Sequence, residues 1–131
     1  MVKKRIISPN VGEPPAKTWS NCLVVGNQVF IAGMTSRDGT TVVGGDSMYE
    51  QSKAIFAKIR HLMEAAGGRM DDIVKIDVFV TDIKRREEVW KARAEVFSGD
   101  FPVSTLVEVR ALAMPELIVE IEAVGILGAG G

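Results

Sequence analysis

Two carboxylates near the end of the chain are the residues whose spacing could most clearly do chemistry. Glu120 and Glu122 alternate with Val119 and Ile121, so both glutamates should point to one face of a strand. Like charges roughly 7 Å apart oppose each other's ionisation, and burial at an interface would raise one pKa and create a general acid or base. The spacing also fits a second interpretation, in which both glutamates form interface salt bridges with cations such as Arg110.

The other potentially reactive side chains carry weaker signals. His61 is the only histidine, and no second ligand lies at metal-binding spacing, so a solvated or half-buried helix position is favoured over a catalytic or metal role. Cys22 lies among apolar residues, which favours a buried thiol over a nucleophile. Because no phosphate-binding loop or dinucleotide motif is present either, the sequence predicts neither a metal nor a cofactor.

Composition narrows the class of protein. The 131 residues fit one domain, expected to span residues 1–131. With 16 basic and 17 acidic residues the net charge is −1, which argues against a nucleic-acid-binding surface. A single cysteine excludes a disulfide-built scaffold, and no run of 18 apolar residues could span a membrane. The N-terminus lacks the apolar stretch of a signal peptide, so a cytoplasmic protein is expected.

Alternating apolar patterns predict the elements that must position these residues. Helices are predicted over 46–66, where Asp46 or Ser47 could cap the start and Gly67–Gly68 the end, and over 85–97. Residues 37–45 should form a loop that could include a short strand at 41–43, and residues 128–131 a frayed tail. Strands are predicted over residues 4–7, 21–25, 28–32, 72–81, 104–110 and 117–123.

This order predicts a two-layer α+β architecture, with one mixed sheet of five or six strands and two helices that cover one face. The other face should then be bare. Its mixture of aliphatic and charged side chains favours a subunit interface over a solvated face, although surface ion pairs would fit the latter. The expected bare-face residues are Leu106, Glu108, Arg110, Ile118, Glu120 and Glu122.

Five segments have a familiar order and spacing over nearly the whole chain: Asn27–Gly33, Gln51–Gly68, Asp72–Lys75, Phe97–Pro102 and Val119–Ala123. Together they resemble the RidA family, also called YjgF/YER057c/UK114. The resemblance implies a chorismate-mutase-like fold and a homotrimer with three ligand clefts between neighbouring subunits. It also implies cofactor-independent hydrolysis of enamines and imines, such as 2-aminoacrylate, to 2-oxo acids and ammonia.

In that family an arginine after the proline holds the substrate carboxylate, and a glutamate of the last strand orients the attacking water. The resemblance puts Glu120 on that glutamate, Gly33 on a glycine beside the cleft, and Trp19 on a tyrosine. Other positions differ from the family. Here Ser104 replaces the arginine, Leu106 a small or thiol residue, Trp90 an asparagine and Met34 a glutamine.

The serine at 104 matters most, because a hydroxyl group cannot supply the charge of a guanidinium fork. Either another cation, with Lys17, Arg37 and Arg93 as candidates, reaches the cleft, or the ligand lacks that carboxylate. The tryptophans suggest a larger or more aromatic ligand, unless they only pack. A hydrolase is therefore the first hypothesis, a non-catalytic small-molecule-binding or regulatory protein the second, and an endoribonuclease or translation inhibitor the least favoured.

Overall fold

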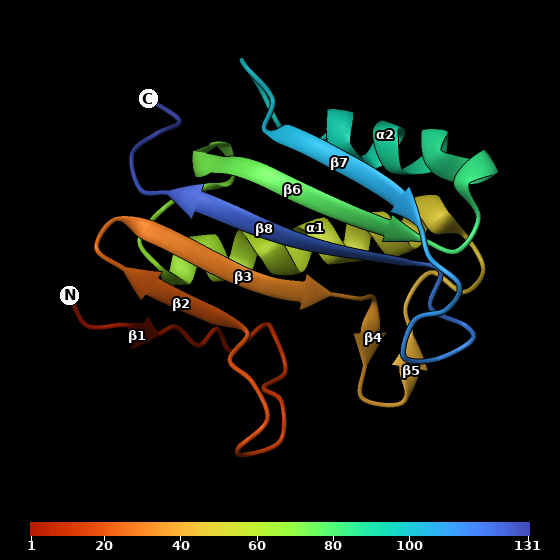
Figure 1. Cartoon of the computed structure of the whole chain (residues 1–131), viewed down its shortest axis with the longest axis horizontal. Helices are drawn as coiled ribbons and strands as arrows, with labels where there is room; N and C mark the ends of the chain where they lie inside the picture. Colours follow the sequence, from red (N-terminus) through yellow and green to blue (C-terminus); the bar gives the residue numbers. More distant parts are fainter.

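The computed structural model describes all residues from 1 to 131, and its sheet has six strands (Figure 1). The strand order is β1-β2-β3-β8-β6-β7, and every neighbouring pair is antiparallel except β6 and β7. The strands of this sheet are β1 (Lys4–Arg5), β2 (Cys22–Val25), β3 (Gln28–Met34), β6 (Ile73–Val80), β7 (Val103–Glu108) and β8 (Val119–Ile126).

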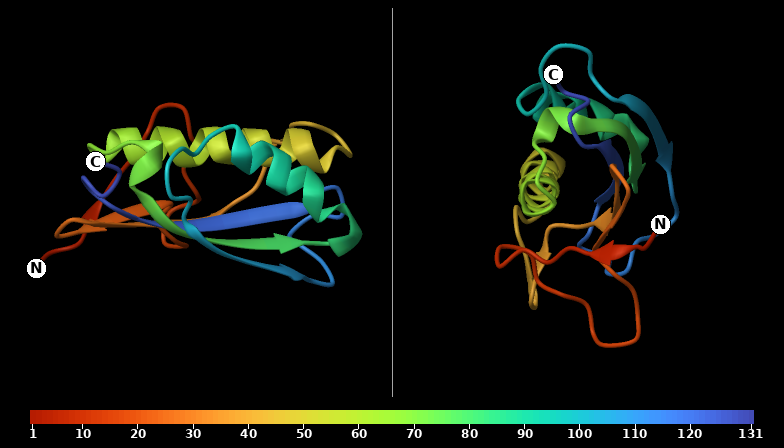
Figure 2. Two further views of the ribbon diagram at one scale, coloured as in Figure 1. Left: turned by 90° about the horizontal axis from the view of Figure 1, so that it is seen from above. Right: turned by 90° about the vertical axis from the view of Figure 1, so that its left-hand side faces the viewer.

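The other elements are two helices, a small hairpin and two 3₁₀ turns. Both helices lie on one side of the sheet and leave its other side bare (Figure 2), so the predicted two-layer α+β architecture is confirmed. The helices are α1 (Met48–Ala65) and α2 (Arg86–Ala94). The hairpin consists of β4 (Arg37–Asp38) and β5 (Thr41–Val42), and the two 3₁₀ turns are at Met70–Asp72 and Ile83–Arg85.

Helix α1 begins and ends where its sequence predicts. The side chain of Ser47 accepts a hydrogen bond from the Glu50 backbone N–H and so caps the first turn. After the helix, Gly67 adopts a φ of 91°, a left-handed conformation that favours glycine. The Gly67 and Gly68 N–H groups bond the carbonyls of Glu64 and Met63, which is the pattern of a Schellman motif.

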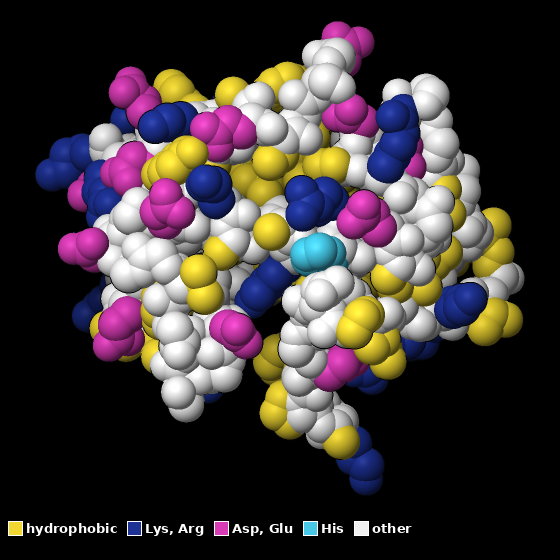
Figure 3. Space-filling view, turned by 180° about the vertical axis from the view of Figure 1, so that it is seen from behind, with side chains coloured by type: hydrophobic (Ala, Val, Ile, Leu, Met, Phe, Trp, Pro, Cys, Tyr) yellow, Lys and Arg dark blue, Asp and Glu magenta, His cyan; other side chains and the backbone are white.

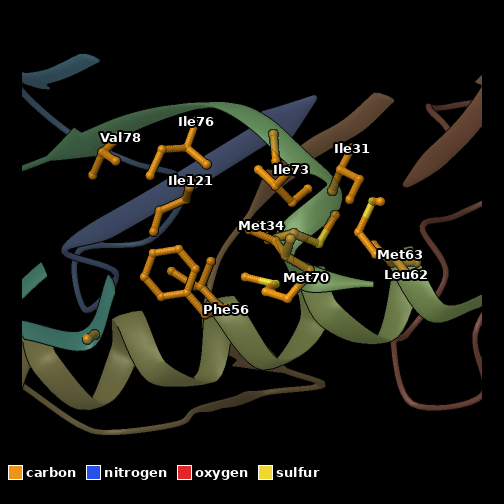
Figure 4. Packing of buried hydrophobic residues seen from close by; sticks show 14 of the residues in the cluster. Ile31, Met34, Phe56, Leu62, Met63, Met70, Ile73, Ile76, Val78 and Ile121 are labelled. Carbon is orange, nitrogen blue, oxygen red and sulfur yellow. The ribbon is translucent and has the colours of Figure 1, made fainter. Parts of the chain in front are cut away.

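The apolar stripe of α1 packs on the sheet and forms most of the core. Phe56 is 1% exposed and lies against the β-strand side chains Ile76 and Ile121 (Figure 4). Its ring meets that of Phe97 edge to face, with centroids 5.8 Å apart. Phe97 belongs to the segment after α2, because this helix ends at Ala94 and does not continue to residue 97 as predicted.

The C-terminal tail is not frayed as predicted. Asp72 is 2% exposed, and its carboxylate accepts hydrogen bonds from the backbone N–H groups of Gly130, at 2.8 Å, and Arg69, at 3.1 Å. Although burial raises the pKa of this carboxyl, the bonds from backbone N–H groups lower it more, and the net shift is downward. Strand β8 also runs to Ile126, because Gly125 pairs with Val29 and Ile73.

The face of β7 corrects the expected bare surface. Ser104, Leu106 and Glu108 pair with the β6 residues Ile76, Val78 and Val80, which are buried beneath the helices. Neighbouring residues in a sheet point to the same side, so these three side chains face the helix layer, and the placement of Leu106 and Glu108 on the bare face is wrong. Alternation separates the two faces of a strand, but only the pairing with β6 decides which face is covered.

Candidate functional site

A break in the pairing of β3 with β8 brings Glu120 against the backbone. The register shifts between Ile31 and Met34, and Gly33 lies in the shifted segment. A Cβ atom added at Gly33 would overlap the carboxyl group of Glu120. The close approach, and not the backbone conformation, therefore favours glycine here, because a larger residue would oblige the Glu120 carboxyl to move, and the φ of Gly33 lies outside the left-handed region.

Beside this contact lies an open hollow of about 850 Å³. Trp19, Gly33, Met34 and Glu120, four of the predicted site residues, line it together with the loop 10–15 and the β4–β5 segment. Figure 3 shows a notch between two projecting lobes on the helix side of the molecule. Trp19 is 56% exposed, whereas Met34 is only 5% exposed and points among the core side chains (Figure 4), so Met34 offers the hollow little surface.

The Glu120 carboxyl is held without a partner. It makes no hydrogen bond or ion pair within the chain, and neither does Glu122, so the interpretation of both as salt-bridged to Arg110 finds no support inside one chain. Burial raises the pKa of Glu120, and the nearby charge of Glu122 raises it further. A carboxyl whose pKa is raised holds its proton more readily than an ordinary glutamate, which suits it to take and return a proton.

Helix α1 fixes the chain that leads into Glu120. The amide of Gln51 is fully buried, and its Nε2 donates to the carbonyls of Gly45, at 2.7 Å, and Glu116, at 2.8 Å. Its Oε1 accepts a hydrogen bond from the Ile118 N–H at 3.1 Å. A satisfied buried amide of this kind holds its partners rigidly, so Gln51 sets the position at which β8 begins.

Lys58 is a hollow-lining residue that the sequence analysis missed. Its ammonium group donates to the carbonyls of Thr35 and Arg37, both at 2.7 Å, and so ties the segment after β3 to α1. Burial lowers its pKa, and the charge of Asp38 opposes that shift. The available signal was a lysine one helical turn after Ile55 on the buried stripe of α1.

The remaining predicted site residues lie elsewhere, where α2 meets β7, in a region here called the α2–β7 edge (Trp90, Arg93, Ser104 and Leu106). Trp90 is 40% exposed, and the guanidinium of Arg86 lies 5.5 Å from the centre of its ring. The hydroxyl of Ser104 accepts a hydrogen bond of 3.3 Å from Arg93 Nη1. One chain therefore does not bring Trp90, Ser104 and Leu106 into the hollow that holds Glu120.

The three candidate cations separate in the same way. Arg37 lines the hollow and donates through Nε to the Gly39 carbonyl at 2.8 Å. Arg93 contacts Ser104, and Lys17 is in neither place. Of the three candidate cations, Arg93 is therefore the one that lies beside Ser104, the position at which the family arginine is missing.

The side chains judged unreactive behave as structural residues. Cys22 is buried, and burial together with Glu13 raises the pKa of its thiol to about 11. His61 is half-buried, and its Nδ1 lies 3.5 Å from the Asn10 amide nitrogen. No three His, Cys, Asp or Glu side chains are grouped so that they could hold a metal ion. Neither helix is long and apolar enough to cross a membrane.

Comparison with known proteins identifies the family. The family described as Endoribonuclease L-PSP matches residues 11–127. A RutC family protein of Pyrococcus abyssi is 30% identical over 92% of this chain and 95% of its own. A 2-iminobutanoate/2-iminopropanoate deaminase of Dermatophagoides farinae is 28% identical over 97% of this chain and 99% of its own.

Structural comparison agrees with this result. The crystal structure of a YjgF/YER057c/UK114 family member from Mycobacterium tuberculosis superposes with a TM-score of 0.82 at 31% identity, over 96% of this chain and 100% of the other. The two helices on a mixed six-stranded sheet thus form the predicted chorismate-mutase-like fold. The family model and the superposition agree over residues 11–127 and over 96% of the chain, respectively, and the chain therefore belongs to the RidA, or YjgF/YER057c/UK114, family.

Proposed function

We propose that this protein hydrolyses an enamine- or imine-type metabolite without a cofactor, in clefts between neighbouring copies of the chain. The observation that carries the proposal is Glu120, a half-buried carboxyl with a raised pKa and no partner, held against Gly33 at the wall of the hollow. A carboxyl poised in this way can take a proton from water and return it. The deaminase name of the mite relative supports the same reaction class.

In the proposed reaction, a water oxygen attacks the imine carbon while Glu120 takes one of the water protons. The C=N double bond becomes a single bond, its electron pair moves to nitrogen, and nitrogen takes the proton back from Glu120. In the resulting tetrahedral intermediate, Glu120 moves a second proton from the hydroxyl group to the amine. Nitrogen then leaves as ammonia while the oxygen electrons form the C=O bond of the 2-oxo product. An enamine enters the same route after protonation at carbon. Positioning and proton transfer suffice for each step.

The assembly proposed for this reaction is a homotrimer. The bare sheet face carries exposed apolar side chains, with Phe30 41%, Val103 67% and Val107 42% exposed. Exposed apolar side chains of this size on a sheet face that no helix covers favour contact with another subunit over contact with water. Light scattering should give three times the 14.2 kDa mass of the chain, and a monomer mass would contradict the assembly. A single domain and a cytoplasmic location stay predictions.

The substrate is proposed to differ from 2-aminoacrylate. In the family resemblance, the residue at position 104 holds the substrate carboxylate, and a serine there offers one neutral hydroxyl. Each hydrogen bond to a charged group contributes about 1.5–3 kcal/mol, so the loss of a guanidinium fork at that place would weaken binding of this small acid strongly. Exposed Trp19 and Trp90 favour a larger or more aromatic ligand.

A second candidate is a non-catalytic protein that binds a small metabolite in the same clefts. The serine at position 104 favours this candidate, because a protein that has lost the arginine that positions the substrate for hydrolysis can still bind a ligand. An endoribonuclease activity, which the family description names, is less favoured because the net charge is −1. Strong dependence of RNA cleavage on salt would be its signature.

The deciding experiment measures imine hydrolysis directly. An amino-acid oxidase generates a panel of 2-imino acids in place, and semicarbazide traps whatever is not hydrolysed. Wild type should lower the trapping rate for part of the panel, and Glu120→Gln should not. If wild type is inert but gains thermal stability from the 2-oxo acids, the binding-protein candidate replaces the hydrolase.

A further inference from the structure

Arg93 is an arginine without a counter-ion at the α2–β7 edge. It forms no ion pair, and its only side-chain hydrogen bond is the 3.3 Å contact to the neutral Ser104 hydroxyl. A guanidinium has five N–H donors, so most of its capacity is unused. Burial lowers its pKa, because part of the charge has lost water and no anion replaces it.

The two arginines at the start of this helix direct their donors to other groups of the chain, although Arg86, like Arg93, forms no ion pair. Arg85 is bonded by Nε to Glu88 at 2.7 Å and by Nη2 to the Asp46 carbonyl at 2.8 Å. Arg86 lies over the Trp90 ring and donates to the Ile83 carbonyl at 3.1 Å. An arginine with a free planar fork is suited to grip a carboxylate through two parallel hydrogen bonds.

The surroundings of Arg93 suggest what kind of carboxylate would fit. Trp90 lies three residues earlier on α2 and so shares its side of the helix, and it exposes 40% of its surface. On β7, Leu106 lies two residues after Ser104 and therefore faces the same way. A ligand held here would present its carboxylate to Arg93 and an apolar or aromatic group to Trp90.

From this geometry we infer that Arg93 is the carboxylate-binding residue of this protein, and that it delivers from helix α2 the charge that Ser104 cannot supply from β7. This inference deepens the proposed function and rests on it, because it gives the imine or enamine substrate a carboxylate. The small serine leaves room for the guanidinium to reach this point. A longer residue at 104 would compete with Arg93 for the same place.

The site is also incomplete within one chain. Ser104 faces the helix layer with its β6 partner Ile76, whereas Glu120 pairs with Phe79 and faces the bare side. The two residues are separated by strand β6 in the sheet. A carboxylate on Arg93 and a reacting carbon near Glu120 can belong to one ligand only if Arg93 comes from one copy and Glu120 from another.

The test measures binding by calorimetry on the full-length protein, with phenylpyruvate and 2-oxobutanoate as probes, each beside its uncharged methyl ester. Wild type should bind at least one acid about tenfold or more tightly than its ester. Arg93→Met should weaken that acid about 10- to 100-fold and leave the ester unchanged. Arg93→Lys keeps the charge but loses the planar fork, so its affinity for the acid should lie between those of wild type and Arg93→Met.

Two further variants guard the interpretation. Arg60→Met removes the same charge from a half-exposed position on α1 and should bind the acid as wild type does. The double variant Arg93→Met/Ser104→Arg returns a guanidinium to the same place from β7 and should regain acid binding. If wild type shows no preference for acid over ester, or if Arg93→Met keeps its acid affinity within twofold, the inference is overturned.

The binding result is independent of turnover. Acid binding that needs Arg93, in a protein that hydrolyses no imine, would support the Arg93 site and reject the proposed reaction. Hydrolysis that Arg93→Met leaves unchanged, both at saturation and at low substrate concentration, would retain the reaction and reject the Arg93 site.

Discussion

The Glu120 hollow and the α2–β7 edge differ in the charge of their unpartnered group and in the face of the sheet to which their residues point. The hollow holds a carboxyl with no partner in the chain, and the edge holds Arg93, whose only partner is a neutral hydroxyl. Glu120 faces the bare side of the sheet, and Ser104 faces the helix side. If two copies of the chain share one site, each copy alone should show such groups of opposite charge without partners, on opposite faces of its sheet.

A second carboxyl, that of Asp72, shows that burial alone does not leave a carboxyl without a partner or raise its pKa. Asp72 is more deeply buried than Glu120, but backbone N–H groups satisfy it and hold its pKa down. Glu120 has no such bonds, and burial raises its pKa. Asp72 therefore fixes the C-terminal segment, whereas the Glu120 carboxyl is left without a partner in the chain.

The largest expected effect is on hydrolysis by Glu120→Gln. An amide cannot accept the water proton, so the rate should fall about 10²- to 10⁴-fold, while the variant melts at or above the wild-type temperature. The semicarbazide trapping assay measures this change. Activity within tenfold of wild type would remove Glu120 from the reaction.

Gly33→Ala should have the next largest effect. The added methyl group would overlap the Glu120 carboxyl and displace it, and a displacement of about 1 Å at a reacting group can cost roughly 10²-fold in rate. The trapping assay with Gly33→Ala and Glu120→Gln measured side by side checks this. An alanine variant as active as wild type would mean that the contact with Gly33 does not position the carboxyl.

Asp72→Asn should affect stability and not hydrolysis. The amide loses charge-assisted bonds to the tail and leaves buried donors poorly matched, which should cost about 1–3 kcal/mol in the free energy of unfolding. Urea titration of the variant measures the loss. Because the pKa of Asp72 is lowered in the folded state, the loss should be greatest near neutral pH and shrink as the pH falls below the pKa of an unfolded aspartate.

The pH dependence of Glu120→Gln should be smaller and opposite in sign. A folded-state pKa raised above the unfolded value means that stability falls as the pH rises through that range. The glutamine variant should therefore be slightly more stable than wild type near neutral pH, and the two should converge below a pH of about 4.3. Thermal melts at several pH values test this, and a less stable variant at neutral pH would contradict the unpartnered state of the carboxyl.

The sequence predicted what short-range patterns encode. Alternation and capping predicted the α+β order and the start of α1 at Ser47, because these depend on residues a few positions apart. The face occupied by Leu106 was predicted wrongly, because it depends on the register of β7 beside β6. Lys58 was missed because its carbonyl partners come from a segment more than 20 residues away.

The same limit applied to the candidate site, whose residues could be named from the sequence but not placed relative to one another. The resemblance named residues of both regions and implied clefts between subunits, but it did not indicate which residues one chain holds in the same region. The spacing of Arg93 on its helix gave no sign of its contact with Ser104, because that contact depends on how α2 lies against an edge strand. Long-range packing thus decides which of the named residues can act together.

The most direct test of the shared cleft uses mixed assemblies. Glu120→Gln and Arg93→Met chains, each weakly active alone at low substrate concentration, are co-expressed with different tags and purified as mixed oligomers. If each cleft combines Glu120 of one copy with Arg93 of its neighbour, random mixing should restore about a quarter of the clefts and a matching share of wild-type activity. Mixed oligomers no more active than the average of the two separate variants would contradict a cleft built from two copies.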